Sequence, residues 1–194
     1  MPIRICRLTS AAAVAALTFT MLASAELKSV GTPEIDLHLP GGTAGLTING
    51  KSSNLTATES GGVIMVTAKL DCVTEDKSHT SCVKTGIEMR DKHVWKYLET
   101  GKFPEATLSV ERSQLKVPNN NEKPESDATG TFLLHGVKRP LSFHYAAQRT
   151  SGDIHVQGQI KINLKDFNIE RPSFAGVHTG TLAEIKVKFT LRDN

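Results

Sequence analysis

Aromatic residues and catalytic motifs are what this sequence most clearly lacks. Its 194 residues include one Trp, two Tyr and seven Phe, so aromatic side chains make up only 5% of the chain. It contains no G-x-S-x-G nucleophile elbow, no H-E-x-x-H zinc motif, no G-x-G-x-x-G and no phosphate-binding loop. We therefore expect a protein that is not an enzyme and has no catalytic residues. Catalysis through His93, His135 or Asp91 would have to be demonstrated by a turnover that is lost when they are replaced.

A metal site is not indicated either. The seven histidines never lie two residues apart on an expected strand or four apart on the expected helix, the spacings that would place two ligands on one face. We expect no metal ligands and no resident cofactor.

No apolar run reaches the roughly twenty residues that a membrane-spanning helix needs. The N-terminus instead has the pattern of a secretory signal peptide. Arg4 and Arg7 precede the apolar residues 11–22, and Ala23-Ser24-Ala25 is a small-residue cleavage site. A membrane anchor is the alternative that this short run disfavours. We expect cleavage after Ala25 and export of residues 26–194 without stable membrane insertion.

Charge of either sign is not in excess in the mature chain. Loss of Arg4 and Arg7 reduces 23 basic residues to 21, against 20 acidic residues, which leaves a net charge of +1. This balance gives no electrostatic case for binding nucleic acid or an anionic membrane surface.

Cysteines are also few, and only Cys72 and Cys82 remain once Cys6 leaves with the signal peptide. An even pair in an oxidising compartment predicts a disulfide, and closing so short a loop contributes roughly 3 kcal/mol on the chain-entropy model. A metal or redox pair assisted by His79 is the alternative. The C-x9-C spacing is typical of neither zinc sites nor thioredoxin-like motifs.

Alternation of apolar and polar residues dominates the rest of the chain. In residues 152–164, Ile154, Val156 and Ile160 share one side while charged and amide side chains share the other, as in a strand with one dry face. The same pattern predicts further strands after Gly61-Gly62, at residues 103–117, 130–137 and 139–148, near the C-terminus and, more weakly, at 43–49 and 53–58. Residues 88–98 change to helical spacing, because Val94, Trp95 and Leu98 cluster on one helical face. Closely spaced strands with one helix favour an antiparallel barrel or sandwich.

Two motifs resemble the YceI-like family of secreted bacterial proteins. Residues 89–110 hold Arg90-Asp91-x-His93 followed by Lys102-Phe103-Pro104, and residues 128–143 hold His135-Gly136-Val137-x-x-Pro140. The stretch INLKDFNI is similar to a family strand and turn, with Asn168 where glycine is usual. The resemblance covers about residues 61–191, and the first strand of the family is not found before residue 61.

This resemblance implies that residues 26–194 form one domain, an eight-stranded antiparallel lipocalin-like barrel with one short helix. It further implies a periplasmic protein whose partner is an amphiphilic lipid, with an isoprenoid quinone or polyprenol as the bound ligand. We expect the Arg90-Asp91-x-His93 motif to anchor the helical segment over the barrel, with direct ligand contact as the alternative. The sequence leaves open whether two copies pair as a homodimer.

An eight-stranded barrel is either filled by its own side chains or holds one small ligand. Because the alternating faces are mostly Ile, Val and Leu and aromatic residues are few, we expect an open apolar channel. The alternatives are a β-sandwich, a filled barrel that serves as an interaction or stress-response module, and an outer-membrane barrel, for which three Trp and Tyr residues cannot form an aromatic girdle. The expected ligand-binding residues are Ile64, Val66, Phe132, Leu134, Phe143, Tyr145, Ile154, Val156, Ile160, Ile162, Ile185, Val187 and Phe189.

Overall fold

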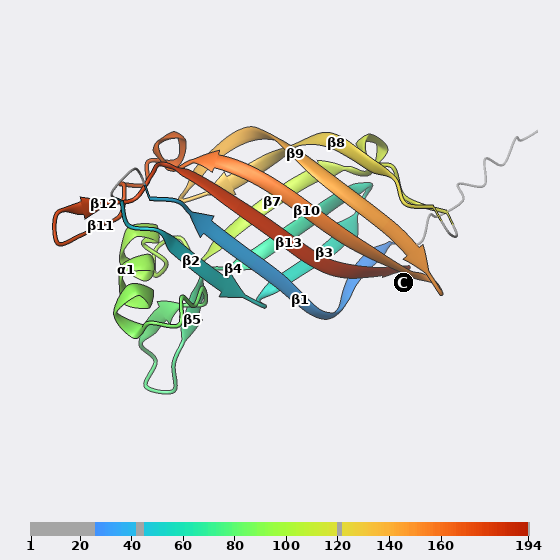
Figure 1. Cartoon of the computed structure of the whole chain (residues 1–194). Coiled ribbons are helices and arrows are strands. Elements are labelled where there is room, and N and C mark those ends of the chain that lie inside the picture. The colour runs from blue at the N-terminus through green and yellow to red at the C-terminus, as the bar shows by residue number, and fades with distance from the viewer. Residues whose placement is uncertain (1–25, 42–44, 120–121, 194) are drawn as a thin grey trace, which may run out of the picture.

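A computed structural model describes residues 26–41, 45–119 and 122–193. The expected signal peptide and its cleavage site lie outside the described residues. Within them the chain forms one sheet that curls into a closed barrel, with α1 (Glu88–Leu98) at one end (Figure 1).

Eight antiparallel strands close the barrel in the order β1-β3-β4-β7-β8-β9-β10-β13, and β13 pairs back onto β1. The expected barrel with one short helix is therefore confirmed, and the sandwich alternative is wrong because a single sheet closes on itself. The bounds of these strands are β1 Leu27–Leu39, β3 Leu55–Ser60, β4 Val63–Lys69, β7 Glu105–Glu111, β8 Glu125–Leu134, β9 Val137–Thr150, β10 Asp153–Asn163 and β13 Leu182–Asp193.

The first barrel strand, β1, is the barrel strand that the sequence did not reveal. Between Val30 and Glu34 it advances four residues while its partner β13 advances two, so a bulge holds two extra residues. Gly31, with φ of +71°, and Pro33 lie inside this bulge. The bulge interrupts the apolar pattern but keeps its phase, so Leu27 and Ile35 both face the interior.

Three other expected bounds are corrected. For the strand expected at residues 43–49, residues 43 and 44 lie outside the described residues, and the strand observed is β2 (Ile48–Ser52), which pairs with the second half of β1. The strand expected at 103–117 ends at Glu111, where η1 (Arg112–Gln114) turns the chain across the barrel end. The strand expected at 130–137 is β8, which begins already at Glu125.

The expected disulfide between Cys72 and Cys82 is present, with the two Cα atoms 5.1 Å apart. It joins the ends of a hairpin made by β5 (Asp71–Val73) and β6 (His79–Ser81), which lies beside α1 (Figure 1). The metal alternative is therefore wrong in this structure, because both sulfur atoms are used in the bond, whereas no observation tests the redox alternative.

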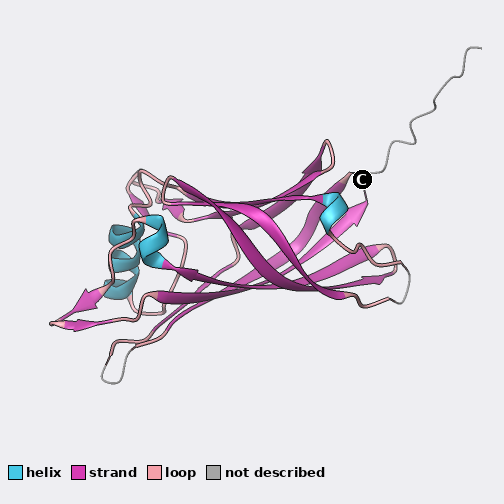
Figure 2. Ribbon diagram, turned by 90° about the horizontal axis from the view of Figure 1, so that it is seen from above, coloured by secondary structure: helices cyan, strands magenta, loops and turns pink. Residues whose placement is uncertain are grey.

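Two apolar clusters form the core, one at each end of the barrel. The cluster at the α1 end includes Leu70, Val94 and Phe167, where η2 (Leu164–Phe167) and the helix fold over the strands. The cluster at the other end includes Leu27, Tyr145 and Leu191. Figure 2 shows the barrel lengthwise, with the longest helix, α1, at one end and a short helical turn at the other.

Candidate functional site

The space between the two clusters is an apolar cavity inside the barrel. Its volume is about 240 Å³, many times the roughly 10–15 Å³ that one water molecule needs on the same measure. Its wall contains all thirteen residues expected from the sequence to line a channel. Their contact with a ligand stays a prediction.

Side chains half-way along the barrel indicate how the cavity arises. Val66, Val156 and Val187 point inward and lie on the cavity wall, where they are only half-buried, although Val66 and Val156 also pack against the cluster at the end opposite α1. Valine reaches less far toward the barrel axis than an aromatic residue does, so three such positions on three strands leave the axis open. Gly158, beside Val187 on the wall, contributes no side chain at all.

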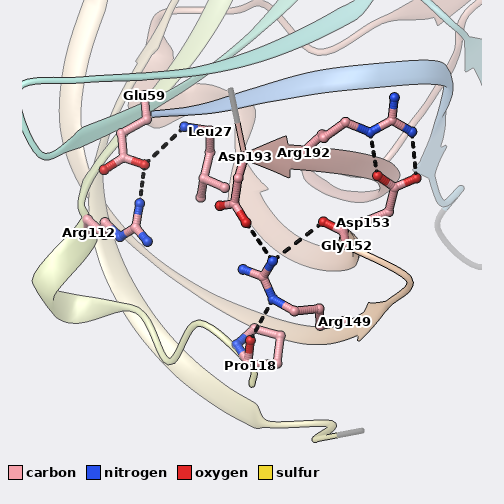
Figure 3. A network of polar contacts seen from close by, with 9 residues as sticks. All are labelled: Leu27, Glu59, Arg112, Pro118, Arg149, Gly152, Asp153, Arg192 and Asp193. Carbon is pink, nitrogen blue, oxygen red and sulfur yellow. Dashed lines mark hydrogen bonds and ion pairs between the residues drawn. The ribbon is translucent and has the colours of Figure 1, made fainter. Parts of the chain in front are cut away.

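The end of the barrel opposite α1 is closed by residues 112–118, here named the end strap. Tyr145 Oη accepts a hydrogen bond from the Lys116 amide at 2.6 Å, and Arg149 Nε donates to the Pro118 carbonyl at 3.0 Å. Arg149 also contacts Asp193 at 2.6 Å (Figure 3). These contacts fix the strap, whose Leu115 and Val117 form part of the cavity wall.

Glu59 connects further segments of the chain at that same end. It shares the inward phase of β3 with Leu55 and Ala57, so its carboxylate is buried. Arg112 at the start of the end strap forms an ion pair with it, and the Leu27 amide donates to it at 3.2 Å (Figure 3). One carboxylate therefore joins β1, β3 and the strap.

At the opposite end, His135 links the helix to the barrel. Its Nδ1 lies 3.1 Å from the Phe167 carbonyl and its Nε2 lies 2.8 Å from a carboxylate oxygen of Glu99, directly after α1. The Phe103 ring packs on the imidazole with centroids 4.5 Å apart. A Cβ at Gly136 would meet this Phe103 ring at 2.7 Å, and φ there is +74°, so glycine fits after the histidine better than any residue with a side chain.

The family assignment follows from the sequence of this barrel. The model of the YceI-like domain matches residues 47–192, which cover most of the chain. The chain belongs to the YceI-like family.

Curated relatives agree with this assignment. Protein YceI of Salmonella arizonae is 31% identical over 99 residues, which cover 47% of this chain and 49% of that protein. The same identity and coverage are found for Protein YceI of Salmonella newport. The chain thus aligns with about half the length of the curated relatives it matches.

Solved structures share the fold. A polyisoprenoid binding domain from Saccharophagus degradans, implicated in plant cell wall breakdown, superposes with a TM-score of 0.68 at 19% identity, over 88% of this chain and 99% of that domain. BcnA of Burkholderia cenocepacia superposes with a TM-score of 0.58 at 12% identity, over 80% of this chain and 95% of that one. Both likenesses establish the barrel fold alone.

The YceI-like motifs act in the structure as anchors of the helix. Asp91 Oδ1 accepts from the amide and the hydroxyl of Thr85 at 2.6 and 2.8 Å, which fixes the chain where it enters α1. Arg90, Asp91 and His93 are all absent from the cavity wall. The anchoring interpretation is therefore favoured over direct ligand contact. Asn168, in place of the usual glycine, has φ of +57°, a conformation that asparagine adopts more readily than most residues.

Part of the wall was not expected from the sequence. Strand β7 contributes inward residues whose alternation is visible in the sequence. The residues from β1 depend on its bulge, those from α1 on how the helix docks, and those from the end strap on how it crosses the barrel end. These additional wall residues include Leu27, Ile35, Leu37, Leu39, Val94, Tyr97, Leu98, Leu108, Val110, Leu115, Val117 and Pro118.

Trp95 corrects one expectation for the helix. It was grouped with Val94 and Leu98 on one apolar face, but the residue is 37% exposed and lies in a cleft outside the barrel.

Among the described residues, no group of three or more His, Cys, Asp or Glu side chains could hold a metal ion. In the same part of the chain, no helix has the length and apolar character needed to cross a membrane.

Tyr97 fastens a second hairpin, β11 (Ser173–Phe174) with β12 (Val177–His178), onto the helix. Its hydroxyl accepts from the Ser173 amide at 3.1 Å and lies 3.3 Å from Ser173 Oγ, and these hydrogen bonds lower the pKa of the phenol. Replacing Tyr97 by Phe is expected to destabilise the YceI-like protein by about 1 kcal/mol, because the Ser173 amide loses its acceptor while the ring packing stays. Denaturant unfolding measures this loss, and amide exchange should quicken mainly at residues 173–178. Unchanged exchange there would contradict the fastening role.

Proposed function

We propose that this protein is a periplasmic carrier that holds one long isoprenoid chain, as in a polyprenol or an isoprenoid quinone, inside its barrel. The observation that carries the proposal is the unfilled apolar cavity that runs between the two core clusters. The fold shared with a polyisoprenoid binding domain supports the same ligand class.

The polar groups near the cavity wall are engaged elsewhere and leave the wall apolar. Gln159 Nε2 donates to Glu184 at 2.5 Å, Lys69 pairs with Glu105, and the Tyr145 hydroxyl accepts from the end strap. A ligand inside would therefore bind through its hydrocarbon chain. Each five-carbon unit moved from water contributes roughly 4 kcal/mol, at about 0.8 kcal/mol per CH₂, so a few units outweigh the ordering cost of binding. Selectivity should depend on chain length and branching more than on the head group.

The competing function, an interaction or stress-response module with a filled core, predicts no internal space. The cavity argues against it. The expectations that the protein is not an enzyme and binds no nucleic acid stay predictions, as does the question of a homodimer.

Mass spectrometry of an organic extract tests the proposal. Protein purified from the periplasm is expected to release a prenyl lipid in near one-to-one amount, and added polyprenol should raise its melting temperature. A straight-chain fatty alcohol of matched carbon number is the control for chain branching. Repeatedly empty extracts together with no thermal shift from either lipid would overturn the carrier function.

A further inference from the structure

Exposed apolar side chains gather at one end of this barrel. The described residues include eight large apolar side chains that are exposed, and only Met65 lies on the barrel wall away from α1. The other seven lie on α1 or directly before it, on the two hairpins beside it, or at the start of β13 (Figure 1). They are Val73, Ile87, Met89, Trp95, Phe174, Val177 and Leu182.

The hairpin of β11 and β12 presents two of these side chains in a fixed arrangement. Phe174 pairs with Val177 across the hairpin, so both side chains lie on one face. Ala175 and Gly176 form its tip with φ of +49° and +78°. The Phe174 ring meets His93 of α1 edge-on at 6.1 Å, and Tyr97 holds Ser173. The hairpin therefore projects from the barrel end (Figure 2) while remaining attached to the helix.

A cationic cleft lies between α1 and the hairpin of β5 and β6. Lys84, Lys92 and Lys96 line it together with Trp95, two histidines and three hydroxyl residues, and no carboxylate is among its lining residues. Lys92 contacts Glu88 at 2.9 Å across the exposed surface of the helix. A net charge of +1 for the mature chain gives no indication of this local excess of lysines.

The opposite end of the barrel presents paired charged side chains and no exposed large apolar ones among the described residues. Arg192 holds Asp153 through two hydrogen bonds of 2.7 and 2.9 Å, which lower the pKa of that carboxyl group, and Arg149 holds Asp193 (Figure 3). None of the eight exposed large apolar side chains of the described residues lies there. The two ends thus differ in apolar exposure, while both contain paired charges such as Lys92–Glu88 at the α1 end.

We propose that the α1 end is a docking surface for a bilayer that contains anionic phospholipid. Phe174 and Val177 enter the interfacial layer, Trp95 lies at the level of the head groups, and the lysines of the cleft meet lipid phosphates. Lys84, Lys92 and Lys96 beside an apolar patch match a surface with an oily layer beneath anionic groups, although Glu88 already pairs with Lys92. The surface is argued without reference to the cavity ligand and goes beyond the carrier function.

Co-sedimentation with vesicles tests this docking. The full mature protein is expected to bind vesicles of phosphatidylcholine mixed with phosphatidylglycerol, to bind phosphatidylcholine alone much more weakly, and to dissociate as salt is raised. The double variant Phe174→Ser, Val177→Ser should lose affinity about tenfold or more. Met65→Ser removes an exposed apolar side chain from the barrel wall and should bind as the unaltered protein does.

Three outcomes would overturn the proposal. They are equal losses for the hairpin and Met65 variants, equal binding to both vesicle types, and binding of inorganic phosphate in the cleft without any vesicle binding. Prenyl-lipid binding in solution, measured on the same variants, separates this result from the carrier function. The hairpin variants should retain it, which also establishes that they are folded.

Discussion

Val156→Trp is expected to weaken prenyl-lipid binding by roughly a thousandfold. Val156, the fourth residue of β10, lies on the cavity wall beside Phe189 of β13 and is half-buried. An indole there occupies the space of roughly five methylene groups of the ligand. At about 0.8 kcal/mol for each, the lost burial is about 4 kcal/mol, which corresponds to three orders of magnitude in Kd. Fluorescence displacement of a bound prenyl probe gives the Kd directly.

The matched control for this variant is Gln157→Trp, one residue along the same strand. Gln157 is exposed on the outer face, so the same substitution should leave the Kd unchanged. The Val156→Trp barrel itself should unfold at the same or a higher temperature, because the new side chain fills apolar space. Equal affinities of the two variants would place the ligand outside the barrel.

The cavity wall could be predicted from sequence as far as period-two alternation specifies it. Val156 and Ile160 on β10 needed only the knowledge that inward residues alternate, and the thirteen expected residues all lie on strands with an unbroken pattern. Alternation alone does not distinguish a barrel from a sandwich, since both bury one face of each strand. The resemblance to the YceI-like family supplied that distinction.

The remaining wall residues depend on contacts distant in the sequence. In β1 the bulge at Gly31 and Pro33 inserts two extra residues and interrupts the alternation of apolar and polar side chains. The strand is therefore recognisable only by its pairing with β13. Trp95 illustrates the reverse error. Helical spacing places it near Val94, but the hairpin of β5 and β6 provides a polar cleft for it outside the core. In both examples the position of the residues depends on how one element packs against another, which a local sequence pattern does not show.

The two ends of the barrel are held by different contacts. The end strap is fixed by Tyr145, Arg149 and Glu59, all through contacts with backbone groups or buried charges. The α1 end is held mainly through His135, Asp91 and Tyr97, and it exposes the apolar side chains. The two ends therefore differ in the side chains that hold them and in apolar exposure.

Arg112→Met is expected to destabilise the protein by about 3 kcal/mol, because it leaves the Glu59 carboxylate buried with the Leu27 amide as its remaining hydrogen-bond donor (Figure 3). Only 4% of the Glu59 side chain is exposed, so water cannot replace the guanidinium. Glu59→Met should cost less, since Arg112 is 25% exposed and can turn toward solvent.

The double variant Glu59→Met, Arg112→Met separates the charge from the packing at this end. It removes both charges and replaces them with apolar side chains. It should be about 1 kcal/mol less stable than the unaltered protein, because the Leu27 amide loses the Glu59 carboxylate as its hydrogen-bond acceptor. Urea unfolding of the four proteins completes the cycle. A double variant as unstable as the sum of the single variants would mean that the two side chains act independently. The buried carboxylate would then not be what ties β1 and β3 to the end strap.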